Sequence, residues 1–156
     1  MASIAITGHR PPGLKLSYSE TDFQKLYEFA KTQLPKYIPG NINMVYDGGA
    51  LGWDQAVALY CLEHGIPYTL VLPAGISYPG IIWSPHSQLL ANKLRQHAAQ
   101  VDLIPSGYLG RDRRMVDQCD YVVALWSGCE DGGTAYTVKY AQRKGKPIFN
   151  LWQFYN

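Results

Sequence analysis

Two glycine-rich stretches of this sequence have the composition of anion-binding loops. Residues 47–54 read Asp-Gly-Gly-Ala-Leu-Gly-Trp-Asp, and residues 127–134 read Ser-Gly-Cys-Glu-Asp-Gly-Gly-Thr. Glycine lets backbone amides approach a ligand closely, and a helix that begins after such a loop points its unpaired amides and the positive end of its dipole to the same place. We therefore expect a phosphate or a ribose phosphate at these loops.

The first loop matches neither of the common phosphate-binding fingerprints, because it lacks both the G-x-G-x-x-G spacing and a following G-K-[ST]. Asp54 falls in the first turn of the expected helix, where it could accept hydrogen bonds from ribose hydroxyls or simply compensate the helix dipole. In the second loop Thr134 is the expected N-cap, and Thr137 rules out a capping box. The expected ligand-binding residues of the two loops are Gly48, Gly49, Ala50, Leu51, Gly52, Gly132, Gly133 and Thr134.

Basic residues stand at two further positions that favour an anion. Gly8, His9 and Arg10 follow the first apolar run, so they are expected at the same edge as the loops, although a turn with solvated side chains is the alternative. Arg111 and Arg114 lie one turn apart where the fourth helix is expected to begin. Cations oppose the dipole at a helix start, so a phosphate is expected beside them, with an ion-pair face as the alternative.

Two tryptophans follow or flank expected strand ends. Trp83 and Trp126 could each stack on a base, although a single tryptophan more often serves packing. Cys61, Cys119 and Cys129 have neither metal-ligand nor redox spacing, so no metal is expected and a reducing compartment is indicated.

The elements that must position these residues alternate between short apolar runs and helical patterns. The expected strands are 3–6, 44–46, 68–72, 101–104, 121–126 and 147–151, and the expected helices begin near residues 19, 52, 84, 111 and 134. Solid apolar runs are typical of parallel strands covered on both faces. We predict an α/β fold in which residues 1–156 form a single Rossmann-like domain, a mostly parallel sheet flanked by helices. Its ligand is expected at the carboxyl ends of the strands.

Composition excludes several classes of protein. The 156 residues are 47% hydrophobic and 17% charged, a composition typical of a globular protein and not of a disordered chain. The formal charge of +2 is too small for a protein whose main function is to bind the nucleic-acid backbone. No apolar run is long enough to span a membrane, and the first residues lack the pattern of a signal peptide. A cytoplasmic location is therefore expected.

Taken in order, the motifs resemble those of the SLOG superfamily, the Rossmann-like group that includes the DprA and LOG proteins. The resemblance rests on residues 7–11, 48–54, 111–117 and 132–134, and it is closest to the YpsA/YoqJ-like branch of bacteria and their phages. It implies a pocket for a nucleotide or a nucleotide derivative such as ADP-ribose or AMP, and the sequence indicates no specific cofactor besides such a ligand. It also implies self-association into a homo-oligomer.

One position departs from the enzymes of that group. LOG phosphoribohydrolases carry P-G-G-x-G-T-x-x-E, and their glutamate assists cleavage of the base–ribose bond, whereas this chain has Thr137 at the matching place. A hydroxyl does not replace a carboxylate base. The leading hypothesis is therefore a nucleotide-binding protein or sensor. The alternatives are a nucleotide N-glycosidase, with Asp54 and Glu130 as first candidate carboxylates, and a DprA-like DNA-binding protein.

Overall fold

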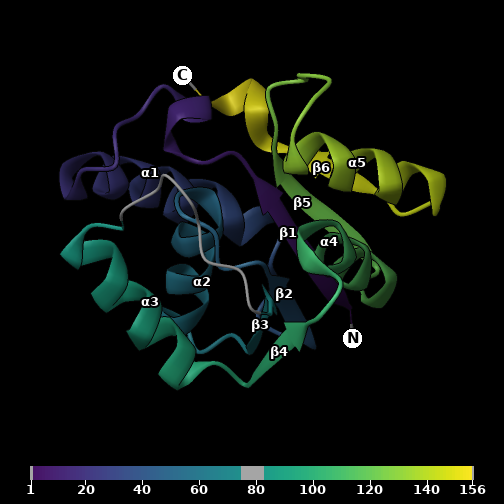
Figure 1. Ribbon diagram of the computed structural model, residues 1–156, viewed down its shortest axis with the longest axis horizontal. Coiled ribbons are helices and arrows are strands. Elements are labelled where there is room, and N and C mark those ends of the chain that lie inside the picture. Colours follow the sequence, from purple (N-terminus) through teal and green to yellow (C-terminus); the bar gives the residue numbers. More distant parts are fainter. Residues whose placement is uncertain (1, 75–82, 156) are drawn as a thin grey trace.

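The computed structural model describes residues 2–74 and 83–155, and it contains one sheet of six parallel strands (Figure 1). The strands lie in the order β4-β3-β2-β1-β5-β6, and each pairs in parallel with its neighbours. From β1 the chain adds β2, β3 and β4 on one side, and it then returns to add β5 and β6 on the other side of β1. The strand order therefore reverses between β1 and β5. Their bounds are β1 Ser3–Gly8, β2 Met44–Asp47, β3 Tyr68–Pro73, β4 Gln100–Ile104, β5 Tyr121–Leu125 and β6 Ile148–Asn150.

Helices cover both faces of this sheet. The α-helices are α1 Glu20–Gln33, α2 Trp53–Glu63, α3 Pro85–His97, α4 Gly107–Gln118 and α5 Gly133–Arg143, with short 3₁₀ turns at Pro11–Leu14, Leu34–Lys36 and Leu151–Phe154. α1, α2 and α3 pack together on one side, and α4 packs against α5 on the other. The predicted Rossmann-like α/β architecture is therefore confirmed.

Alternation along β1 explains how one strand serves two cores. Ile4 and Ile6 belong to the core under α1 and α2, whereas Ala5 between them belongs to the core under α4 and α5. All three are completely or almost completely buried. A strand with both faces covered must be apolar at every position, which is why the run shows no polar alternation.

The helix starts follow local capping chemistry. The side chain of Ser19 accepts from the amide of Asp22 at the start of α1, and Ser84 accepts from Ser87 ahead of Pro85 at the start of α3. Both starts agree with the sequence prediction. No helix among the described residues is long and apolar enough to cross a bilayer.

One predicted helix start and one predicted N-cap were wrong. α4 begins at Gly107, a full turn before Arg111, so Arg111 lies within the helix and does not oppose the dipole at its first residue. The N-cap of α5 is Gly132, not Thr134. Gly132 has φ of 100° and ψ of 172°, a backbone conformation that only glycine adopts readily, and this lets the helix begin two residues earlier than a cap at Thr134 would.

Candidate functional site

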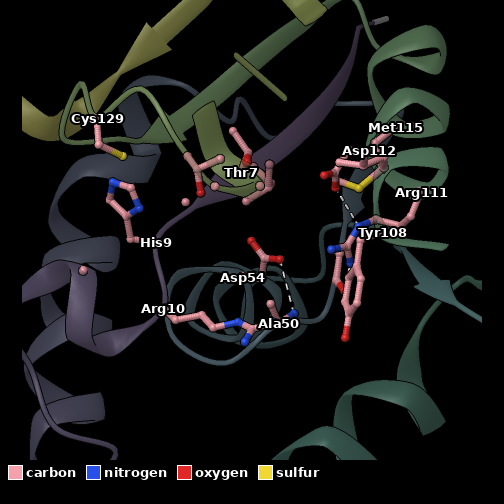
Figure 2. Close-up of a pocket in the computed structure, with 18 of the residues that line it drawn as sticks. Thr7, His9, Arg10, Ala50, Asp54, Tyr108, Arg111, Asp112, Met115 and Cys129 are labelled. Carbon is pink, nitrogen blue, oxygen red and sulfur yellow. Dashed lines mark hydrogen bonds and ion pairs between the residues drawn. The ribbon is translucent and has the colours of Figure 1, made fainter. Parts of the chain in front are cut away.

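A cavity of about 740 Å³ opens at the carboxyl ends of β1 and β5, where the strand order reverses. Its volume lies in the range of roughly 300–1,000 Å³ that small-molecule sites occupy. Figure 2 shows its walls, which come from the end of β1, the loop after β2, the start of α4 and the loop between β5 and α5. This is the place at which an open parallel sheet binds its ligand.

One wall is the N-terminus of α5. Gly132, Gly133 and Thr134 all line the cavity, and no side chain caps the helix. A Cβ added at Gly132 would meet no described atom within 4 Å, so the space on that side of the residue is open. The second glycine loop thus presents a helix N-terminus to the cavity. The predicted succession of loop and helix is present, but the predicted cap at Thr134 is not.

The first glycine loop plays a different part. Gly48, Ala50 and Asp54 line the cavity, whereas Gly49, Leu51 and Gly52 do not. A Cβ on Gly49, which has φ of +68°, would lie 2.8 Å from Leu72, and one on Gly52 would lie 2.9 Å from Pro11. The glycines at 49 and 52 therefore allow tight packing behind the cavity wall.

Gly8 has a comparable packing role at the end of β1. A Cβ there would lie 2.2 Å from the indole of Trp53, which is fully buried at the start of α2. The absence of a side chain at residue 8 lets α2 begin directly beneath the strand end. This close approach brings Asp54, the next residue of α2, to the cavity.

Asp54 is the deepest acid that faces the cavity. It is 6% exposed; its Oδ2 accepts from the Ala50 amide at 3.2 Å, and its Oδ1 has no hydrogen-bond partner among the described residues. Burial raises the pKa of Asp54 to about 7, against the opposing charge of Arg111. Asp47 lies behind the wall, and its Oδ1 accepts from the Gly49 amide at 2.8 Å. Burial, followed by the nearby charge of Asp54, raises the pKa of Asp47 well above its ordinary value.

Arg111 joins α4 to the first glycine loop. Its Nη1 donates to the carbonyl oxygen of Gly48 at 2.7 Å, and its Nε donates to Oδ1 of Asp112 at 2.7 Å. Both residues are more than 90% buried. Burial raises the pKa of Asp112, against the charge of Arg111 and the neighbouring hydroxyl of Thr137. The guanidinium is thus held within the protein by buried partners.

His9 connects two of the walls. Its Nε2 accepts from the backbone amide of Ser127 at 2.9 Å and lies 3.0 Å from the Ser127 hydroxyl. Its ring also meets Trp152 edge to face, with centroids 6.0 Å apart. Accepting from an amide requires Nε2 to carry no proton, so the neutral ring has its proton on Nδ1. Burial lowers the pKa of His9, which favours this neutral form.

Several expected site residues lie outside the cavity lining. Arg114 is exposed on α4, and the indole Nε1 of Trp126 donates to the Cys129 carbonyl at 3.0 Å. Trp83 and Glu130 are also absent from the lining, although Glu130 is next to Cys129, which contributes to it. Of the sequence-predicted site, the structure gathers Gly8, His9, Arg10, Gly48, Ala50, Asp54, Arg111, Gly132, Gly133 and Thr134.

Sequence reasoning did not include Asp112, Tyr108 and Leu109 among the ligand-binding residues. All three line the cavity from α4. An ion-pair face, the alternative reading of this segment, would expose its acids, yet Asp112 is 7% exposed. The available signal was the spacing Asp112-x-x-Met115-Val116: Met115 and Val116 are buried on the same helix, so residue 112, one turn earlier, also faces inward.

Comparison with known proteins identifies the fold of this chain but not its family. No family model matches the chain, and no curated protein does. Among solved structures, the protein TM1055 has 21% identity and a TM-score of 0.60, covering 95% of this chain and 72% of its own. DprA from Streptococcus pneumoniae has 17% identity and a TM-score of 0.58, over 96% of this chain and 50% of DprA. The molybdenum cofactor carrier protein from Chlamydomonas reinhardtii has 20% identity and a TM-score of 0.60, over 94% and 74%.

These similarities support the Rossmann-like part of the resemblance read from the motifs. Each covers nearly the whole of this chain, so the match is to the entire sheet and both helix layers. This chain spans half the length of that DprA. Because all identities lie below 25%, the likeness shows a shared fold, which also hosts unrelated functions.

Proposed function

We propose that this protein binds a small phosphorylated ligand of the ribonucleotide class in the cavity between β1 and β5, as a sensor or binding protein. The observation that carries the proposal is the uncapped N-terminus of α5 on the cavity wall. Its first-turn amides and the positive end of the helix dipole form a site suited to an anion.

Arg10 supports the same assignment. It lines the cavity, and Figure 2 shows its side chain extending beneath Asp54 and Ala50. Its positive charge acts on the carboxyl of Asp54. A cation on one wall and a helix N-terminus on another give an anionic ligand favourable interactions at both places. The order of the four motifs further supports membership of the YpsA/YoqJ-like branch, with AMP or ADP-ribose as the first ligands to test.

Calorimetric titration with AMP, ADP-ribose and adenosine tests the proposal. AMP and ADP-ribose are expected to bind more tightly than adenosine. Arg10→Gln is expected to weaken AMP by about 1.5–3 kcal/mol, the scale of a charged hydrogen bond, and to change adenosine binding little. Arg95→Gln on the exposed face of α3 is the matched control and should leave both affinities unchanged. Equal affinity for AMP and adenosine would contradict a phosphate site.

Hydrolysis of the base–ribose bond is the second candidate function. The observation in its favour is that two buried carboxyls, Asp54 and Asp112, line the cavity on different helices, and burial raises the pKa of both. Carboxyls whose pKa is raised by burial are typical of acid–base catalysis. Against it, the hydroxyl of Thr137 donates to the Gly133 carbonyl at 2.8 Å and serves the helix backbone. We therefore favour binding over catalysis.

A further inference from the structure

The inner end of the cavity carries more carboxyl groups than cations. Asp54 and Asp112 face it, and Asp47 is fully buried behind it. Two cations of the cavity lining act on these three carboxyls: Arg111, held among them, and Arg10, whose charge acts on Asp54. Arg111 donates to Asp112 and to the Gly48 carbonyl, so two of its donors already serve the protein. A phosphate placed here would meet carboxyl oxygens at short range, and such like-charge contacts are unfavourable in a buried setting.

A specific acceptor at this inner end lacks a donor. Oδ1 of Asp54 is buried and has no hydrogen-bond partner among the described residues, while Oδ2 of the same carboxyl is satisfied by the Ala50 amide. An unpaired buried acceptor costs free energy, and that cost is removed when a donor arrives. When Asp54 is ionised, above its pKa of about 7, the inner end is therefore suited to a group that donates hydrogen bonds.

The N-terminus of α5 lies at the exposed side of the cavity, because Gly132 and Gly133 are exposed whereas Asp54 is buried. The Cβ position of Gly132 meets no described atom within 4 Å, whereas that of Gly133 is 3.8 Å from Oδ2 of Asp112. The carboxyl of Asp112 thus already compensates the inner side of the α5 N-terminus. The outer side of this N-terminus, at Gly132, therefore stays available to an anion.

We propose that the ligand enters with its pentose hydroxyls innermost, donating to Oδ1 of Asp54, and with its phosphate at the mouth beside Gly132. This rests on the proposed function, because it assigns an orientation and a ligand class to the same cavity. Asp54 becomes a specificity-determining residue that distinguishes ribose from deoxyribose. Sites built to hydrogen-bond a hydroxyl discriminate strongly against analogues that lack it, since the buried acceptor is then left unpaired.

A second donor on a nucleotide is the amino group of its base. If this group occupied the inner end, the cavity would discriminate between AMP and IMP, which carries an oxygen in place of that amine. It would then be indifferent to the sugar hydroxyls. The two orientations therefore make opposite predictions for two comparisons of affinity, AMP with 2′-deoxy-AMP and AMP with IMP.

Calorimetry on the unmodified protein with AMP, 2′-deoxy-AMP, IMP and ribose 5-phosphate separates them. We expect 2′-deoxy-AMP to bind at least tenfold more weakly than AMP, IMP to bind like AMP, and ribose 5-phosphate to bind measurably. Equal affinities for AMP and 2′-deoxy-AMP, or a preference of AMP over IMP alone, would overturn the proposed orientation while leaving a nucleotide site in place. Failure of all four ligands would overturn the proposed function itself.

Asp54→Ala removes the acceptor, and we expect it to reduce the preference for AMP over 2′-deoxy-AMP to less than threefold. Asp54→Asn keeps the size of the side chain and an acceptor oxygen, so it should retain part of the preference. Asp102→Asn on the edge strand β4 is the control and should keep the full preference. A full preference in folded Asp54→Ala would assign the discrimination to another residue. The comparison of ligands on the unmodified protein stands even if Asp54→Ala does not fold.

Discussion

Nη1 of Arg111 lies 2.7 Å from the carbonyl oxygen of Gly48 and donates to it, joining the middle of α4 to the loop that follows β2. The contact spans 63 positions of sequence. It requires a glycine, because a Cβ at position 48 would lie 2.6 Å from the same Nη1 atom and 2.9 Å from Oδ2 of Asp54. One arginine and one glycine thus fix the inner wall of the cavity.

Removal of Arg111 should destabilise the fold. Arg111→Ala would leave Asp54, Asp112 and Asp47 buried without their cation, and breaking a buried ion pair costs about 3–5 kcal/mol. Urea unfolding monitored by tryptophan fluorescence measures this. Arg114→Ala, which truncates an exposed side chain on the same helix, should change the free energy of unfolding by less than about 0.5 kcal/mol. Equal losses in the two variants would contradict the structural role of Arg111.

A methyl group at Gly48 should also be costly. Gly48→Ala would force apart the guanidinium of Arg111 and the carboxyl of Asp54, and overpacking of this kind costs about 1–3 kcal/mol. Gly40→Ala is the matched control, because a Cβ there meets no atom within 4 Å. Unfolding free energies of both variants test the prediction, and a Gly48→Ala protein as stable as Gly40→Ala would refute it.

The contribution of Asp54 to the free energy of unfolding should fall as the pH rises from about 4 to about 7. The folded-state pKa of Asp54 is raised to about 7, so below pH 4 its carboxyl is protonated in the folded and unfolded states alike. Between the two pKa values the unfolded state releases a proton that the folded state retains, which favours unfolding increasingly up to pH 7. In Asp54→Asn this decline should be smaller. Denaturant unfolding at pH 4.5 and pH 7.5 measures both slopes, and parallel slopes would contradict the buried titration.

The contact between His9 and Ser127 should weaken on acidification. Burial lowers the pKa of His9, so the unfolded or opened chain takes up a proton more readily than the folded ring. The contact is therefore fully stable above the ordinary histidine pKa near 6.5 and loses stability as the pH falls below it toward the folded value. Hydrogen exchange of the Ser127 amide, corrected for its intrinsic pH dependence, should show falling protection from pH 7 to pH 5. Constant protection, or the same fall in His9→Gln, would contradict this.

Adenine release from AMP should be absent or slow. A missing acid–base group costs on the order of 10²–10⁴-fold in rate, and Thr137 occupies the place of the glutamate in the motif that LOG enzymes carry. A chromatographic assay for adenine tests this. Rapid release would favour the hydrolase over the binding protein, and Asp54→Asn and Asp112→Asn would then identify the carboxyl responsible.

The chain pattern predicts the central strands well because parallel strands covered on both faces are mostly apolar, as β1, β3 and β5 are. The pattern is weaker in β4, an edge strand that contains Gln100 and Asp102. It locates the two glycine loops for a similar reason, since glycine marks where the backbone turns or approaches closely. It could not separate a glycine that faces a ligand from one that faces a side chain. Gly132 and Gly49 have the same local sequence character, and the difference between them is Leu72, a residue from another strand.

The same limit applies to charge. Arg111 and Arg114 are equivalent by composition, yet one is buried on Gly48 and Asp112 and the other is exposed. The burial of each arginine depends on where α4 begins. The helix begins at Gly107, earlier than the local charges indicate. Long-range pairing of charges is therefore visible only once the helices are placed on the sheet.

The most direct test of a phosphorylated ligand at the mouth of this cavity is an amide NMR titration of the unmodified protein with AMP. The largest shift changes are expected at the amides of residues 132–134, where α5 begins, with smaller changes at Ala50 beside Asp54. The same residues should respond to inorganic phosphate at higher concentration. Saturable AMP binding that leaves residues 132–134 unperturbed, or no binding at millimolar AMP, would contradict the account.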